Sequence, residues 1–562
     1  VPANDWNVTL QSGICLDIVP IGETDYAVRP YGFDDAFRGD VTNNTTLFMG
    51  RPVGEWMEKR GIRAEELVRT DDLQAARLFP ATSNMKQLEQ LVGWFLSDEP
   101  DAVTTALWRE LPRYAADELS IHANLRRLFA QRRELQAQTL PVVARNWRKS
   151  VFYQTNLKDM AQRFDSLHLP MPEALPADAP LMTRIHDAMF RSEMMRPTDE
   201  AQAALYEKQA FSLLREGLTE NVLRHRVQPR MTTYSDQIVW GRSSVRIDLA
   251  GGWTDTPPFS LTAGGNVVNL AIELNGQPPL QVYVKPCKEP VVICRSIDLG
   301  AMERIETYDE LGLYNKVGSP FSIPKAALTL AGFMPGFGVE SYGSLRQQLE
   351  AFGCGMEITL LAAIPAGSGL GTSSVLAATV LGALSDFCGL GWDKNEVCNR
   401  TLVLEQLLTT GGGWQDQYGG VMHGLKLLQT GPGFDQNAAV RWLPDTLFTD
   451  PDMRPCHLLY YTGVTRTAKH ILAEIVRGMF LNNSRHLNIL NGMKQHALSV
   501  FEALQRNDLD QFGRMVMTTW EQNKALDAGT NPPVIEELCQ RVDDFCTGYK
   551  LPGAGGGGFM YM

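Results

Sequence analysis

A glycine-rich stretch at 364–376, IPAGSGLGTSSVL, leads into small hydroxyl residues and then into an apolar run. Such a stretch could hold a phosphate group, because the first turn of a helix offers backbone N–H donors and the positive end of the helix dipole. Gly367, Gly369 and Gly371 would let the backbone approach closely, since glycine has no Cβ. The lysine of a Walker loop is absent, so backbone amides, helped by magnesium, would carry the contact. The alternative is a glycine turn that enters a buried, serine-capped helix.

Two carboxylates downstream could complete a phosphate and metal site. Magnesium prefers hard oxygen ligands, commonly a hydroxyl and one or two carboxylates together with the phosphates. Residues 395–408 are predicted to form a helix, and Glu405 lies one turn before its end. Asp416 follows eleven residues later in a glycine-rich turn. Taken alone, Glu405 would be a solvated helix charge and Asp416 a turn residue.

The elements that position these residues can be inferred from hydrophobic periodicity and turn signals. Residues 356–387 are typical of a strand, a loop and a helix, and 237–259 of a strand that runs into a glycine turn. Strands and helices mix from 237 onward, which favours an α+β fold there. Between 53 and 236 apolar residues recur at helical spacing, which predicts a helical connector. Residues 1–52 are rich in β formers and turns but too few to bury a sheet face alone, which predicts the end of a larger β structure.

Three glycine-rich motifs occur in order along the chain. They read GRSSVRIDLAGGWTDTPP at 241–258, IPAGSGLGTSSVLAA at 364–378 and KLPGAGGGG at 550–558. Together they resemble the motifs of the GHMP kinases, the family of galactokinase and mevalonate kinase. The resemblance implies a two-lobed kinase domain over 237–562, with an N-lobe at about 237–450 and a C-lobe at about 451–562. It also implies that the chain stops short of the usual end of the family fold.

The resemblance assigns roles to individual residues and implies ATP and Mg²⁺ as cofactors. Asp416 would act as the catalytic base, and Arg246 would stabilise the deprotonated hydroxyl and the transferring phosphoryl group. Ser373 and Glu405 would be the magnesium ligands, and Ser374, one place off the family register, remains a candidate. The residues implied to bind ATP are Pro365, Gly367, Ser368, Gly369, Leu370, Gly371, Thr372, Ser373 and Ser374.

Other segments have weaker assignments. The glycines of 550–558 are predicted to support the phosphate loop by close packing. Residues 458–472 are typical of a strand, a turn and a helix. Thr465 and Arg466 could face the substrate cleft there or could simply begin the helix.

The first motif narrows the substrate. Asp255 matches the family's aspartate and would hold ring hydroxyls, and Gly413 is also predicted to contact the substrate. Where galactokinases have a glutamate that reaches the 6-hydroxyl of the sugar, this chain has Gly252, and Trp253 stands in place of the histidine. A pocket without that acceptor, walled by an apolar ring, suits a 6-deoxy sugar with its methyl group. The alternative for Gly252 is a backbone requirement in a tight turn.

The stretches VWGRSSVRIDLAGGWTDTPPF at 239–259, GICLDIVPI at 13–21 and YAVRPYGFDDAFRGD at 26–40 resemble the bifunctional L-fucokinase/GDP-fucose pyrophosphorylases, in which a guanylyltransferase with a β-helical tail precedes the kinase. This implies ATP-dependent phosphorylation of L-fucose at the anomeric hydroxyl, giving L-fucose 1-phosphate and ADP in the salvage route to GDP-fucose. Residues 1–52 would be the end of the β-helical tail, and 53–236 the connector. No G-x-x-x-R-x-x-x-x-K loop is visible near the start, so this chain is not expected to be a guanylyltransferase itself, although such a domain would be covalently linked in the parent protein.

Two alternative functions remain. AGGWTD, at 250–255, also resembles AGGGTD of heptose kinases, which would keep the fold and change the sugar to a heptose phosphate or another hexose. A phosphorylated substrate would need extra basic residues, and none is obvious in the first motif. A sensor that binds sugar and ATP without turnover is the other alternative. Catalysis is favoured because Ser373, Glu405, Asp416 and Arg246 are all present.

The amino-acid composition disfavours several classes of protein. The 562 residues are 44% hydrophobic with a net charge of −12, which disfavours nucleic-acid binding. The longest apolar stretches fall short of the roughly 20 residues that a membrane-spanning helix needs. Nine scattered cysteines without C-x-x-C spacing predict free thiols and no zinc site. We therefore expect a cytoplasmic protein without nucleic-acid or membrane partners, and its oligomeric state stays open.

Overall fold

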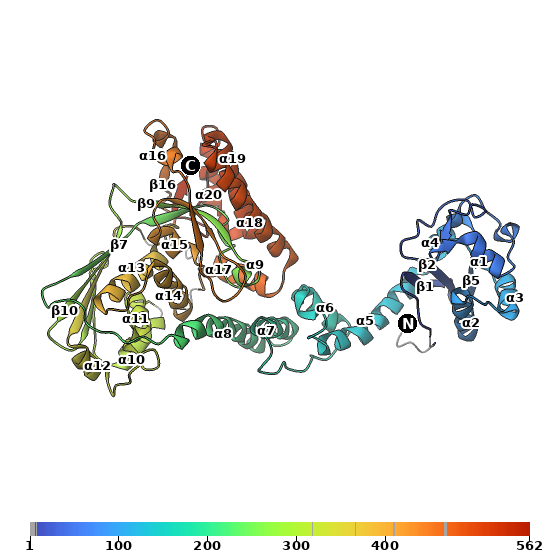
Figure 1. Ribbon diagram of the computed structural model, residues 1–562, viewed down its shortest axis with the longest axis horizontal. Helices are drawn as coiled ribbons and strands as arrows, with labels where there is room; N and C mark the ends of the chain where they lie inside the picture. Colours follow the sequence, from blue (N-terminus) through green and yellow to red (C-terminus); the bar gives the residue numbers. More distant parts are fainter. Residues whose placement is uncertain (1–5, 7, 317, 366, 409–410, 466–468) are drawn as a thin grey trace. The chain divides into compact units, whose positions relative to one another are not determined.

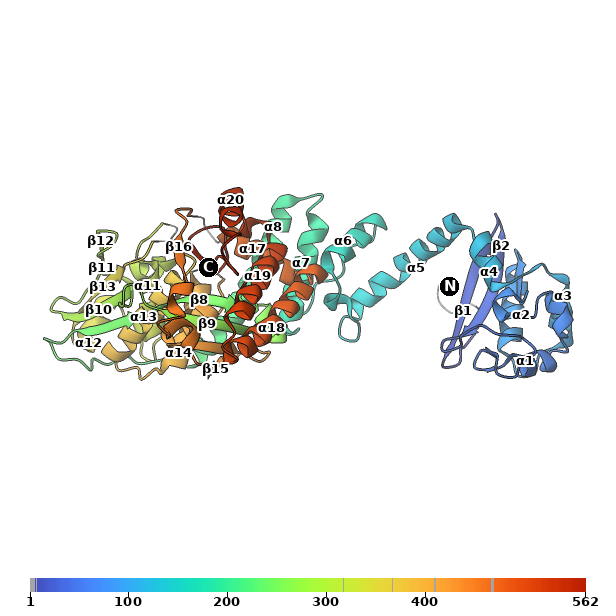
Figure 2. The same cartoon turned by 90° about the horizontal axis from the view of Figure 1, so that it is seen from above.

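The computed structural model describes the chain apart from residues 1–5, 7, 317, 366, 409–410 and 466–468. The chain divides into two compact units, of which the first holds Val1–Phe152 and Phe164–Pro172. The second holds Tyr153–Arg163 and Glu173–Met562, so the division passes through α6 (Leu157–Ser166). Figures 1 and 2 label the elements of both units. Among the described residues, no helix is both long and apolar enough to cross a membrane.

The first unit is built on a four-stranded antiparallel sheet with the strand order β1-β2-β5-β6. β1 and β2 form a hairpin in which Ile14 pairs with Gly32 and Ile21 with Asp25. Helix α2 packs on β2 and β5, and its buried Trp94 and Phe95 join one apolar core with Trp56 and Trp108. The elements of this unit are β1 (Ile14–Ile21), β2 (Asp25–Gly32), β3 (Leu47–Phe48), β4 (Arg51–Pro52), α1 (Val53–Lys59), β5 (Phe79–Thr82), α2 (Met85–Leu96), α3 (Ala102–Glu110), β6 (Arg113–Tyr114), α4 (Ala116–His122) and α5 (Leu125–Arg145).

The structure does not confirm a β-helix-like segment at 1–52 or a helical connector at 53–236. All strand pairings described in the first unit are antiparallel, whereas a β-helix stacks parallel strands. Its core also crosses position 52, because Val28 and Phe48 pack in the same cluster as Leu88. The short strand β5 pairs with β2, which lies far away in the sequence, and β6 pairs with β5 across two intervening helices, so local periodicity could not reveal them.

The second unit has the α+β organisation that the sequence predicts, with two main sheets and helices packed against them (Figure 1). Its five-stranded sheet has the order β12-β11-β13-β10-β7, and its four-stranded sheet the order β15-β14-β9-β8. The strands are β7 (Val239–Ser243), β8 (Val245–Ala250), β9 (Asn266–Ile272), β10 (Leu280–Cys287), β11 (Val292–Ser296), β12 (Ala301–Ile305), β13 (Gly355–Ala362), β14 (Leu425–Gln429), β15 (Ala439–Trp442), β16 (Leu459–Tyr461) and β17 (Phe559–Tyr561). A further pair, β16 and β17, joins the end of the chain to an earlier segment.

Helix α13 lies at the centre of the second unit, where it packs on β7 and β10 and against α11, α14 and α15. Helices α18 and α19 pack on β8. The helices are α7 (Leu181–Met195), α8 (Glu200–Arg224), α9 (Phe259–Ala263), α10 (Tyr308–Gly312), α11 (Ser322–Leu328), α12 (Leu345–Phe352), α13 (Thr372–Phe387), α14 (Lys394–Leu407), α15 (Gln415–Val421), α16 (Thr446–Thr449), α17 (Lys469–Phe480), α18 (Ser484–Gln505), α19 (Leu509–Leu526) and α20 (Pro533–Val542). The predicted strand, loop and helix at 356–387 are confirmed as β13 and α13, and the helix at 395–408 as α14. The division into two lobes near position 450 stays a prediction.

Candidate active site

A cavity of about 250 Å³ in the second unit brings the three sequence motifs together. Of the residues that the sequence selects for the site, it is lined by Arg246, Trp253, Asp255, Gly367, Ser368, Gly369, Gly371, Thr372, Ser373, Gly413 and Asp416. Pro365, Gly252, Leu370, Ser374 and Glu405 do not line it, and Leu370 is fully buried in the core. Thr465 is exposed outside the lining, and the prediction for Arg466 falls outside the described residues.

The glycine-rich loop has the backbone that a phosphate cradle requires. Gly367, Gly369 and Gly371 have φ values of 70°, 78° and 74°, in a region that residues with a Cβ rarely adopt. Gly371 is the N-cap of α13, and within the described chain no side chain caps that first turn. Its backbone N–H groups therefore remain available to an anion. Ser368 and Thr372 close the loop with a 2.8 Å bond between their hydroxyls.

The third motif supports this loop from behind, as the sequence predicts. A Cβ on Gly369 would lie 2.7 Å from the carbonyl oxygen of Pro552, and a Cβ on Gly553 would lie 2.9 Å from the carbonyl oxygen of Gly369. The backbone N–H of Phe559 donates to the carbonyl of Ser368 at 2.9 Å. Side chains at these glycines would push the two segments apart, so glycine is required here for close packing.

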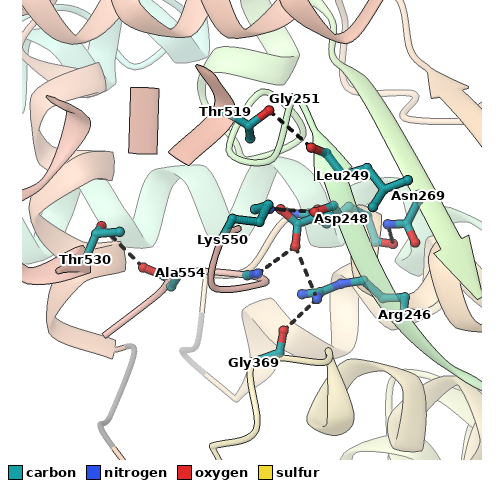
Figure 3. A network of polar contacts seen from close by, with 12 residues as sticks. Arg246, Asp248, Leu249, Gly251, Asn269, Gly369, Thr519, Thr530, Lys550 and Ala554 are labelled. Carbon is teal, nitrogen blue, oxygen red and sulfur yellow. Dashed lines mark hydrogen bonds and ion pairs between the residues drawn. The ribbon is translucent and has the colours of Figure 1, made fainter. Parts of the chain in front are cut away.

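Arg246 and Asp416 form the charged centre of the cavity. The Nε and Nη2 groups of Arg246 donate to Oδ1 of Asp416 at 2.9 and 2.6 Å, and Nη1 donates to the carbonyl of Gly369 at 2.6 Å (Figure 3 shows the latter contact). Arg246 is 2% exposed. Burial alone would lower its pKa, but the carboxylates of Asp416 and Asp248 outweigh that effect and raise the pKa above the ordinary value. The guanidinium thus stays charged and links the loop to Asp416.

A buried ion pair that the sequence did not indicate lies beside Arg246. The Nζ of Lys550 donates to Oδ2 of Asp248 at 2.6 Å and to its backbone carbonyl at 2.5 Å, while the N–H of Gly553 donates to Oδ1 at 2.6 Å (Figure 3). Nη1 of Arg246 lies 3.5 Å from the same Oδ1. Lys550 is 0% exposed and Asp248 1%. One signal could have revealed Asp248: it follows Arg246 by two positions in β8, so strand alternation places both on one face.

Asp255 and Trp253 form another part of the lining. Asp255 accepts hydrogen bonds from the backbone N–H of Gln415 at 3.0 Å and from its side-chain amide at 3.2 Å. Burial raises the pKa of Asp255 to about 7, although the N–H of Gln415 opposes this. Gly413 packs so closely on the Asp255 carboxylate that a Cβ would overlap it. Trp253 belongs to an apolar cluster with Phe259 and residues of α17 and α18.

Gly252 has a packing reason that does not involve a substrate. A Cβ at this position would lie 2.8 Å from Oδ2 of Asp248 and 3.5 Å from the amide nitrogen of Gln415. The first of these distances is too short for any side chain. The alternative hypothesis, that glycine is required at position 252 by local packing, therefore has direct geometric support.

Glu405, predicted to bind magnesium with Ser373, contacts Ser374 instead. Ser374 donates from Oγ to Oε1 of Glu405 at 2.8 Å, and both residues are buried. Ser373 is exposed and lines the cavity. A Cβ on Gly412, another lining residue, would lie 3.7 Å from Oε2 of Glu405, so the carboxylate is close behind the cavity wall. Glu405 thus pairs with Ser374, the residue one place off the family register.

Two family models match the second unit. Residues 340–424 match the GHMP kinases N terminal domain, and residues 500–562 match the GHMP kinases C terminal domain. The matched segments contain the glycine loop, Glu405, Asp416 and the third motif.

Three known proteins are similar over longer stretches. The L-fucokinase/L-fucose-1-P guanylyltransferase of Bacteroides fragilis is 59% identical over 563 residues, covering 100% of this chain and 59% of that protein. The bifunctional fucokinase/GDP-fucose pyrophosphorylase of Arabidopsis thaliana is 27% identical, covering 98% of this chain and 54% of that protein. The D-glycero-alpha-D-manno-heptose 7-phosphate kinase of Campylobacter jejuni is 25% identical over 335 residues, covering 57% of this chain and 88% of that protein. The chain therefore spans less than two thirds of the length of the first two relatives.

Proposed function

We propose that this chain transfers the γ-phosphoryl group of ATP to the anomeric hydroxyl of L-fucose, because residues 340–424 and 500–562 match the models of the N-terminal and C-terminal domains of the GHMP kinases. The products are L-fucose 1-phosphate and ADP. The observation that carries the proposal is the Arg246–Asp416 pair, which lies against the glycine loop in a cavity lined by all three motifs. The 59% identity with the Bacteroides fragilis protein supports fucose as the sugar.

The residues present fit an ATP and Mg²⁺ group. The loop glycines and the uncapped start of α13 suit the phosphates. The hydroxyl of Ser374 and the carboxylate of Glu405 are hard oxygen donors of the kind that Mg²⁺ prefers. We assign them as the protein ligands, with Ser374 in the place that the sequence gave to Ser373. Bound Mg²⁺ would offset the negative charge of the phosphates.

The two serines can be separated by experiment. We expect Ser374→Ala to raise the Mg²⁺ concentration that gives half-maximal activity by about tenfold or more, because ligand and support losses at metal sites have effects of that size. Ser373→Ala serves as the matched control and should change this Mg²⁺ concentration much less. Magnesium titrations of ADP release would measure both effects. A larger effect of Ser373→Ala would identify Ser373 as the magnesium ligand.

The chain's own groups account for the chemical step. Asp416 takes the proton of the anomeric hydroxyl, the freed oxygen bonds to the γ-phosphorus, and the bond to the ADP oxygen breaks. A positioned base of this kind contributes roughly 10²–10⁴-fold. Arg246, fixed between Gly369 and Asp416, stabilises the negative charge that develops on the attacking oxygen and the transferring group.

The sugar side of the cavity agrees with a 6-deoxy hexose. Asp255 supplies hydrogen-bonding oxygens for ring hydroxyls, and Trp253 supplies an apolar surface for a methyl group. The glutamate that would accept a 6-hydroxyl cannot stand at position 252 while Asp248 keeps its place. Fucose lacks that hydroxyl and needs no such acceptor.

A heptose phosphate is the second candidate, because the Campylobacter jejuni kinase is similar over 335 residues. A phosphorylated sugar needs additional positive charge in its pocket. Among the described residues that line the cavity, Arg246 is the single basic side chain, and Asp416 already engages it. The charge of the lining therefore favours an unphosphorylated sugar.

The test is ADP release with L-fucose, D-galactose, D-arabinose and D-glycero-D-manno-heptose 7-phosphate as acceptors. We expect turnover with L-fucose well above that with D-galactose, because position 252 is a glycine where galactokinases have the glutamate that reaches the 6-hydroxyl. Turnover with the heptose phosphate and none with L-fucose would refute the choice of sugar. Absence of ADP release with every acceptor, despite binding of sugar and ATP, would favour the sensor alternative.

The longer relatives also suggest a setting for the reaction. Their names pair the kinase with a guanylyltransferase or pyrophosphorylase, so we propose that L-fucose 1-phosphate passes to a covalently linked domain of that kind. A cytoplasmic location stays a prediction.

A further inference from the structure

Helix α17 supports the sugar side of the cavity. Leu472 of this helix lines the cavity, and Ile471 and Ile475 pack in the same apolar cluster as Trp253. The glycine loop rests on a different support, the third motif. The position of α17 therefore bears on Trp253 more directly than on the phosphate loop.

Helices α7 and α8 hold α17 through a cluster of four alternating charges. Arg477 of α17 forms a short ion pair with Glu193 of α7, and its Nε lies 3.5 Å from Oε2 of Glu207 in α8. Arg196 completes the cluster, with 3.1 Å to Glu193 and 2.7 Å to Glu207. The Glu193 side chain is 5% exposed and that of Arg477 21%, whereas Arg196 and Glu207 are 36% and 29% exposed, so the cluster is partly shielded from water. Each carboxylate lies near two guanidinium groups, so removing one arginine changes the electrostatic interactions of both carboxylates.

The end of α17 is fixed by backbone contacts to the same region. The Nδ1 of His186 lies 2.8 Å from the carbonyl of Phe480, and the N–H of Leu157 donates to the carbonyl of Leu481 at 2.9 Å. The ring of Phe211, from α8, packs edge-on against Phe480 with centroids 5.1 Å apart. Helix α17 also contacts α7 directly. The segment that the sequence identified as a connector thus bonds to the helix behind the sugar pocket.

We propose that the helix pair α7–α8 is a positioning element of the kinase, which sets the affinity for the sugar through the contact of Glu193 with Arg477. This rests on the proposed function, because it presumes a sugar beside Trp253. Neither Glu193 nor Arg477 lines the cavity, so both act through α17 and are not catalytic residues. If α17 is held less firmly, Trp253 should also be held less firmly. The glycine loop should keep its position, because the third motif supports it.

The experiment compares Arg477→Met with the wild-type chain and with Arg541→Met. Arg541 forms an exposed pair with Glu537 at 2.6 Å within α20, so it controls for loss of an arginine and an ion pair. We expect Arg477→Met to raise the KM for L-fucose about fivefold, with the KM for ATP and kcat nearly unchanged. Arg541→Met should leave all three as in the wild type. Equal increases of both KM values, or none, would overturn the proposal.

A second measurement separates this proposal from the proposed function. Amide hydrogen exchange over 469–480 in the full chain needs no turnover, and we expect faster exchange there in Arg477→Met and Glu193→Gln than in Arg541→Met. If the wild-type chain does not phosphorylate L-fucose, the choice of sugar fails while faster exchange still supports the restraint on α17. If fucose is phosphorylated but exchange in α17 and the KM for fucose are the same in all variants, the positioning role fails alone.

Discussion

Two groups of ion pairs support the cavity, and they differ in burial and in the elements that they connect. The pair of Asp248 and Lys550 is called the first cluster, and the group of Glu193, Arg196, Glu207 and Arg477 the second cluster. Asp248 and Lys550 are withdrawn from water entirely and connect β8 to the third motif behind the glycine loop. The cluster of Glu193, Arg477 and their neighbours keeps some exposure and connects three helices. A buried charge that loses its partner is costly, whereas a partly hydrated one can recover water. We therefore expect the first cluster to determine both folding and phosphate positioning, and the second to adjust one wall of the pocket.

The largest effect should come from the chemical group beside the first cluster. Asp416→Asn keeps the shape of the side chain and removes the base, so kcat should fall by roughly 10²–10⁴-fold. Steady-state ADP release with L-fucose would measure it, with thermal unfolding as the check on folding. Full activity in this variant would remove Asp416 from the mechanism.

Lys550→Met tests how strongly the first cluster depends on pairing. It leaves the Asp248 carboxylate buried without its cation, and we expect the free energy of unfolding to fall by about 3–5 kcal/mol. Denaturant titration would measure the change.

The double variant Asp248→Asn/Lys550→Met is the matched control, since it removes both charges. It should be more stable than Lys550→Met but have low activity, because Asp248→Asn removes the carboxylate near Nη1 of Arg246. Recovery of activity together with stability would mean that the pair only holds the fold.

Asp255 gives a pH-dependent effect of intermediate size. Its pKa, raised by burial to about 7, means that the carboxylate is only partly ionised near neutrality. If the ionised form accepts the sugar hydroxyls, the KM for L-fucose should fall about tenfold between pH 6 and pH 8. The same raised pKa favours folding at low pH, and that contribution is lost as pH rises through 7. In Asp255→Asn the KM for L-fucose should be higher and independent of pH. If the KM of this variant still fell with pH, the pH dependence would belong to another group.

The smallest effect is expected for the coupling within the second cluster. A double-mutant cycle of Glu193→Gln and Arg477→Met should give a coupling free energy of about 1 kcal/mol in thermal or denaturant unfolding. The same cycle on Asp248 and Lys550 should give several times that value. Equal couplings would show that the difference in burial has no energetic meaning.

Sequence reasoning selected most residues that line the cavity and the glycines that pack behind the phosphate loop, but it missed the ion pairs that support both. Local patterns identified the glycine loop, Arg246 and Asp416, because glycine spacing and short motifs are visible along the chain. Lys550 pairs with Asp248 across 302 positions, and Arg477 pairs with Glu193 across 284, so no local window contains either pair. That Ser374 and not Ser373 contacts Glu405 depends on the direction of side chains in the first turn of α13, which spacing alone does not supply.

Gly252 carries a consequence for protein engineering. If the chain phosphorylates L-fucose as proposed, the first substitution to try for sugars with a 6-hydroxyl is a glutamate at position 252. That change overlaps Asp248, and moving Asp248 strips Lys550 of its counter-ion. We therefore expect a glutamate at position 252 to need accompanying changes at positions 248 and 550.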